Sequence, residues 1–182
     1  VELVEMMKGI DEKIEIIPAH AWTPWFSLFG SMSGFDSVEE CFQDQTKHIH
    51  AIETGLSSDP AMNWRLSQLD KYTLVSSSDA HSFWPWRIGR EANVFDINLS
   101  YDDLLGAIRD KKGFLHTIEV DPNYGKYHID GHRACDVSME PKESIQNNNI
   151  CPKCKKPLTV GVLQRVEKLA DREEGFKPKN AL

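Results

Sequence analysis

The sequence lacks any apolar run that approaches the roughly 20 residues of a membrane-spanning helix. It also shows no charged and then apolar leader pattern. We therefore expect a cytoplasmic protein with no membrane partner. A hydrophobic content of 40% and a charged content of 27% agree with this expectation, because both are those of a soluble globular protein.

Cysteine is scarce, with four residues in a chain of 182. Cys41 stands alone, whereas Cys135, Cys151 and Cys154 lie together late in the chain. So few and so uneven a set excludes a disulfide framework. The late cluster is more typical of a metal site.

Basic residues are in the minority, and a net charge of −7 argues against sequence-independent nucleic-acid binding by the chain as a whole. The average conceals an asymmetry. Residues 1–125 carry ten Lys and Arg against twenty Asp and Glu, whereas residues 126–168 carry eight against five. The later segment is therefore the better candidate for contact with phosphate groups.

The segment YTLVSSSDAH, residues 72–81, predicts a buried strand that ends in two side chains able to bind a metal. If the backbone stays extended, Asp79 and His81 leave the strand on the same face. A carboxylate beside an imidazole suits a divalent cation such as zinc, manganese or magnesium. The alternative is a turn aspartate followed by a solvated histidine.

Other predicted strands also end in candidate site residues. His20 follows a strand over residues 14–17, and Glu53 lies at the end of a strand that begins near His48. His48 and His50 fall on the opposite face from Glu53, so we expect them to lie away from the site. With a further strand in FLHTIEV, the alternation of strands and helices predicts an α/β fold built from parallel β/α units. The site residues would then gather at the carboxyl ends of the strands, as in a β/α barrel.

An aromatic loop follows His20. Trp22, Trp25 and Phe26 are candidates for stacking on a base or sugar, although they would equally well cap the core. Arg87 and Arg90 follow the Asp79 segment and are candidates for holding a substrate phosphate, or for a structural ion pair.

From residue 124 onward the pattern predicts a zinc ribbon with a carboxyl-terminal amphipathic helix packed on it. His132 and Cys135 form one pair with two intervening residues, and Cys151 and Cys154 form a second pair after a further fifteen residues. Three thiolates and one imidazole complete a tetrahedral structural zinc site. His128 is the rival fourth ligand.

Five segments, in this order, resemble the PHP-superfamily phosphoesterases that carry a zinc ribbon, of the endonuclease Q type. They are PAHAWTPWF, SSDAHS, GREANVFD, GKYHIDGHRACD and CPKCKKPLTVGVLQRVEKLADRE. The resemblance implies a distorted β/α barrel with a cluster of divalent metals at the strand ends, held in part by His20, Asp79 and His81. It also implies nicking of DNA on the 5′ side of deaminated bases or abasic sites.

The family's first motif, His-x-His, is absent from residues 1–13. We therefore expect residues 1–123 to be the carboxyl-terminal part of a PHP barrel, with residues 124–182 as the ribbon module and further chain on both sides. The leading hypothesis is a metal-dependent DNA repair endonuclease whose fragment here is inactive or nearly so, with Glu53, Arg87 and Arg90 as candidate catalytic residues. The alternatives are a PHP phosphatase acting on a small phosphorylated metabolite and a non-catalytic zinc-ribbon binding module.

Overall fold

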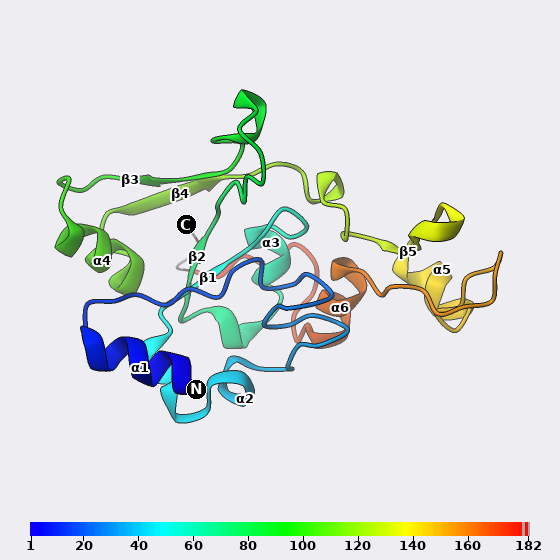
Figure 1. Cartoon of the computed structure of the whole chain (residues 1–182), viewed down its shortest axis with the longest axis horizontal. Coiled ribbons are helices and arrows are strands. Elements are labelled where there is room, and N and C mark those ends of the chain that lie inside the picture. The colour runs from blue at the N-terminus through cyan, green and yellow to red at the C-terminus, as the bar shows by residue number, and fades with distance from the viewer. Residues whose placement is uncertain (180, 182) are drawn as a thin grey trace.

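The structure of the protein is a computed structural model, which describes residues 1–179 and 181 (Figure 1). The α-helices are α1 (Glu2–Ile10), α2 (Val38–Phe42), α3 (Pro60–Asn63), α4 (Tyr101–Asp110), α5 (Pro141–Gln146) and α6 (Val162–Leu169). The strands are β1 (Ala51–Glu53), β2 (Thr73–Val75), β3 (Ala92–Phe95), β4 (Phe114–Ile118), β5 (Asp130–His132) and β6 (Val137–Met139). Short 3-10 turns lie at η1 (Gln43–His48), η2 (Ser67–Leu69), η3 (Pro85–Arg87), η4 (Pro122–Tyr124) and η5 (Arg133–Cys135).

Side-chain caps determine where three of the helices begin. Asp59 accepts a hydrogen bond from the Met62 amide and is followed by proline at the first helical position of α3. Ser100 accepts from the Asp103 amide at the start of α4. At α2 the cap is Ser37, whose side chain accepts from the Glu40 amide. All three contacts satisfy amides that have no partner inside the helix.

The expected run of parallel strands is not confirmed. Within the described residues, β1 and β2 form the one parallel pair, whereas β4 pairs antiparallel with β3. The strand expected at residues 14–17 is not formed, although its end lies beside β1, where the Glu53 amide donates to the Pro18 carbonyl over 3.0 Å. Proline has no amide hydrogen, which limits the ladder that this segment can form with β1.

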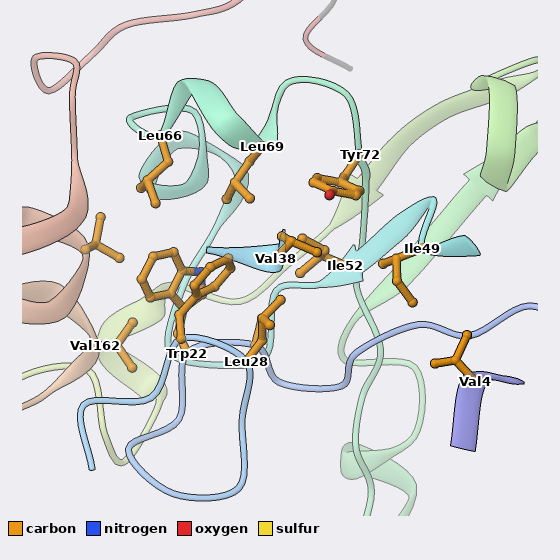
Figure 2. Close-up of a cluster of buried hydrophobic side chains, with 13 residues drawn as sticks. Val4, Trp22, Leu28, Val38, Ile49, Ile52, Leu66, Leu69, Tyr72 and Val162 are labelled. Carbon is orange, nitrogen blue, oxygen red and sulfur yellow. The ribbon is translucent and has the colours of Figure 1, made fainter. Parts of the chain in front are cut away.

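The main core gathers side chains from both ends of the chain (Figure 2). Trp22 and Leu28 from the aromatic loop pack with Ile52 of β1 and Val162 of α6. The last helix contacts β5, as predicted, and it also packs into the main core, which the sequence did not predict. The buried positions of α6, Val162 and Val166 among them, contribute to the main core, because this is the larger apolar surface available to them.

The segment expected to form the ribbon, called the ribbon below, has a small core of its own. β5 and β6 pair antiparallel, and Met139, Cys151 and Leu158 form a cluster separate from the main core. Gly131 of β5 bridges to Thr159 just before α6, so the ribbon is joined by backbone hydrogen bonds to the segment that leads into the main core. None of the helices in residues 1–179 is long and apolar enough to cross a membrane.

Candidate functional site

The ribbon brings together four potential metal ligands. The ligand atoms of His132, Cys135, Cys151 and Cys154 all lie within 4.8 Å of one another. His132 ends β5, Cys135 lies in the turn η5, and the other two lie in a tight turn in which the Lys155 amide donates to the Cys151 carbonyl over 2.9 Å. A set of three sulfurs and one imidazole nitrogen can hold a metal ion such as zinc.

The protonation of these thiols also fits a cation site. A hydrogen bond with the Cys154 thiol, and then burial, raise the pKa of Cys135 to about 11. Burial raises the pKa of Cys151, but hydrogen bonds from the Cys154 and Lys153 amides and from the Cys154 and Cys135 thiols together leave that pKa lowered. Thiols this close together oppose one another's ionisation, and a bound cation removes the opposition.

The rival ligand His128 lies elsewhere. Its side chain is buried, and its Nδ1 lies 2.9 Å from the Ser57 carbonyl oxygen. The structure therefore groups His132, and not His128, with the three cysteines.

Glu53 supports the loop that carries His20. Its buried carboxylate accepts hydrogen bonds from the His20 amide and, over 3.0 Å, from the Gly55 amide. Burial raises the pKa of Glu53, against the lowering effect of these amide donors. His20 adopts a φ of 33°, a left-handed conformation that is uncommon away from glycine, and Glu53 bonds the amide at this position.

Asp79 and His81 lie in a loop beyond β2, not on an extended strand. The strand ends at Val75, and Asp79 has a φ of 43°. The His81 side chain is 83% exposed, with its Nδ1 2.7 Å from the Asp79 carbonyl oxygen and 3.7 Å from Asp79 Oδ1. The sequence-based picture of two side chains leaving one strand face is therefore wrong, because the backbone turns before it reaches them.

The loops that carry His20 and Asp79 line a common cleft of about 390 Å³. His20 and Asp79 line it together with Trp25 and Phe26 of the aromatic loop and Tyr127 beyond β4. His81 is not among its lining residues. In the described part of the chain, the ribbon set is the one group of three or more potential ligands whose atoms converge, so His20, Asp79 and His81 do not form a closed metal site by themselves.

The three aromatic candidates separate into two kinds. Trp22 is 1% exposed, and its Nε1 donates to Asn63 Oδ1 over 2.8 Å, so it is a core residue and not available to a substrate. Trp25 and Phe26 are 39% and 91% exposed and line the cleft. Trp25 also meets the Tyr127 ring edge to face at 6.0 Å.

Neither candidate arginine lines the cleft. Arg90 donates from Nε and Nη2 to the Ser78 carbonyl, at 3.1 and 2.9 Å, and so braces the loop that carries Asp79. Arg87 lies in η3, which projects from the body of the molecule (Figure 1).

His50 lies away from the cleft, as expected. Its Nδ1 lies 2.7 Å from Glu15 Oε1, and Arg109 pairs with the other oxygen of the same carboxylate.

Sequence reasoning missed two acidic residues next to this site, of which Glu91 is buried and Glu119 is half-buried. Glu91 accepts a hydrogen bond from the Ser76 hydroxyl over 2.8 Å, and burial raises its pKa. Burial also raises the pKa of Glu119 to about 8, with further contributions from Glu91, Asp59 and Glu53. The available signal was a glutamate placed directly beside an apolar strand segment, in GREANVF and in FLHTIEV.

No protein-family model matches the chain. Two curated proteins do. MJ0043 of Methanocaldococcus jannaschii is 35% identical over 162 residues, which are 84% of this chain and 19% of that protein. YqxK of Bacillus subtilis is 34% identical over 167 residues, which are 90% of this chain and 41% of that protein.

The fold is similar to that of endonuclease Q. The crystal structure of the lesion-specific endonuclease PfuEndoQ from Pyrococcus furiosus matches 99% of this chain with a TM-score of 0.81 and 33% identity. A complex of endonuclease Q with a 27-mer duplex that has an abasic lesion at the active site matches 99% of this chain with a TM-score of 0.84, also at 33% identity. This chain spans 44% of each of those chains and less than half of both curated relatives.

Proposed function

We propose that this chain is part of a metal-dependent phosphodiester hydrolase, a DNA repair endonuclease that nicks on the 5′ side of deaminated bases or abasic sites. The observation that carries the proposal is the match of 99% of the chain, at 33% identity and a TM-score of 0.84, to an endonuclease Q bound to a duplex with an abasic lesion. The cleft beside His20 and Asp79 supports it, because it combines potential metal ligands with exposed aromatic rings.

In this proposal the barrel-derived part, residues 1–123, acts on the phosphodiester, and the ribbon in residues 124–182 is a structural zinc module beside it. His20, Asp79 and His81 contribute ligands to a cluster of zinc, manganese or magnesium ions, which is completed by residues outside this chain. Such ions polarise a phosphate and lower the pKa of bound water. Glu53 holds the His20 backbone in position and is a positioning residue.

The proposed substrate contacts follow from exposure. Trp25 and Phe26 are exposed and line the cleft, where they would accommodate a base turned out of the duplex. Arg87 would contact a backbone phosphate, since guanidinium groups bind phosphate through two parallel hydrogen bonds. Arg90 has a positioning role, because it bonds the Ser78 carbonyl.

A nicking assay tests the proposal. The full-length gene product, loaded with manganese or magnesium, is incubated with labelled duplexes that contain one abasic site, one uracil or no lesion, and separately with a small phosphomonoester. We expect 5′ nicks at the lesions, and little cleavage of the undamaged duplex or the phosphomonoester. Hydrolysis of the phosphomonoester without DNA nicking would contradict the proposal, and the 182-residue chain alone is expected to bind zinc and to nick DNA slowly or not at all.

A further inference from the structure

An exposed group of aromatic rings projects from the structure directly after the Asp79 loop. We name residues 80–90 the aromatic finger; it connects β2 to β3 and appears in Figure 1 as the green loop above β3 and β4. Phe83, Trp84 and Trp86 are 80%, 48% and 65% exposed. Large apolar side chains that lie together on an exposed surface mark an interaction site.

The rings of the finger are ordered against one another. Trp84 and Trp86 stack with centroids 5.0 Å apart and an interplanar angle of 13°, and Phe83 packs against Trp84 at 5.0 Å. This arrangement preorganises a flat aromatic surface, so little conformational entropy is lost when a further ring stacks on it. Nucleic-acid bases are such rings, and stacking on aromatic side chains is tolerant of base identity.

The charge of the finger complements a nucleic acid. Its ionisable residues are His81, Arg87 and Arg90, and none is acidic, in a chain whose net charge is −7. Aromatic and cationic side chains together are the composition of surfaces that follow a nucleic-acid strand.

The base of the finger is fixed beside the candidate site. Arg90 donates to the Ser78 carbonyl, and the Ser78 hydroxyl donates to the Glu91 carbonyl over 3.1 Å. Both ends of the finger are therefore held together next to Asp79, and the rings project from a rigid base.

We propose that the aromatic finger inserts into duplex DNA at the lesion. A base that is missing, or turned out into a pocket, leaves a gap in the stack, and apolar side chains that enter such gaps hold the duplex open. Trp84 and Trp86 stack on the bases that border the gap. This inference rests on the proposed function and adds the element that recognises the distorted duplex, apart from the cleft that would take the base.

The test removes the rings without touching the cleft or its proposed ligands. The double variant Trp84→Ala with Trp86→Ala is compared with the ring-conserving variant Trp84→Phe with Trp86→Phe, and with Leu99→Ala, which removes a fully exposed apolar side chain elsewhere. Binding of the full-length gene product to an abasic duplex, an undamaged duplex and an abasic single strand is measured by fluorescence anisotropy. A 2-aminopurine beside the lesion reports stacking directly.

We expect the alanine variant to bind the abasic duplex about ten- to a hundredfold more weakly, as is typical for the loss of one or two base-stacking rings. Its binding to the abasic single strand should change little, and the 2-aminopurine signal on binding should disappear. The phenylalanine variant should restore both the affinity for the abasic duplex and the 2-aminopurine signal. Leu99→Ala should match the wild type.

Three results would overturn the proposal, and they are distinguishable. If the alanine variant keeps the wild-type affinity and 2-aminopurine response, the proposed role of the finger is contradicted, while the proposed function still stands. Shielding of Trp84 and Trp86 from acrylamide in the full-length gene product without DNA would show that other parts of the chain cover the finger. If the wild type neither binds nor nicks abasic DNA, both the proposed endonuclease function and the proposed role of the finger are contradicted.

Discussion

The two candidate metal sites differ in how far apart in the chain their ligands lie. All four ribbon ligands fall within residues 132–154 and converge to within 4.8 Å. His20 and Asp79 come from separate loops, line a common cleft, and do not converge with His81 into a closed set among the described residues. A local set of ligands can assemble from a short piece of chain, whereas a site built from distant strand ends depends on the whole surrounding fold.

The largest effect on stability is expected at the ribbon. Cys151→Ser removes a buried candidate ligand, and we expect bound zinc to fall from one per chain to near zero. Structural zinc contributes on the order of 10 kcal/mol to the folding free energy of such modules, so the ribbon should lose most of its stability. Metal analysis by mass spectrometry checks the zinc content. The control variant Cys41→Ser changes a half-buried cysteine outside the ribbon, and the ribbon zinc should be retained in it. Full zinc occupancy in Cys151→Ser would show that the cluster is not the site.

Two residues of the aromatic loop, Trp22 in the core and Phe26 at the cleft, should differ in their contribution to stability. Trp22→Ala should lower the free energy of unfolding by about 3 to 5 kcal/mol, because it opens a cavity and leaves Asn63 without its indole donor. Phe26→Ala should change stability by less than about 0.5 kcal/mol, because that ring is exposed. Chemical denaturation measures both. Equal losses would contradict the division between the two residues.

The half-buried Glu119 predicts a pH dependence of stability. In the folded chain the pKa of Glu119 is about 8, above its ordinary value of 4.5, so the native state binds the extra proton between these values. Stability should therefore fall as pH rises from about 5 to 8, by on the order of 3 kcal/mol. Denaturation across this range checks it. Glu119→Gln should flatten the dependence, and an unchanged slope in that variant would assign it to other groups.

The smallest effect on stability, with the largest on activity, is expected at Asp79. Asp79→Asn keeps a residue that tolerates the left-handed backbone at this position. Stability should change by less than about 0.5 kcal/mol, whereas lesion nicking by the full-length gene product should fall by about a hundredfold or more through loss of a metal ligand. Asp96→Asn, at an exposed acid after β3, is the matched control. Unchanged nicking in Asp79→Asn would exclude it from the site.

Local features were predictable from the sequence. The helix starts at Asp59 and Ser100 follow from contacts between residues three apart, and the four ribbon ligands follow from the spacing of two short pairs. Burial was not predictable in the same way. Trp22 and Phe26 are four residues apart in one loop, and nothing in their type indicates that one lies in the core and the other in the cleft.

The sequence by itself determined which side chains are available to the sites: those that could bind a metal, those that cap helices, and those that carry the resemblance to PHP phosphoesterases. Only the tertiary structure decided the pairing of β4 with β3, the packing of α6 in the main core, and the turn that takes Asp79 and His81 off their strand. The physical reason is that caps and paired ligands depend on atoms a few residues away. Strand pairing and helix docking depend instead on which distant apolar surfaces are available to be buried.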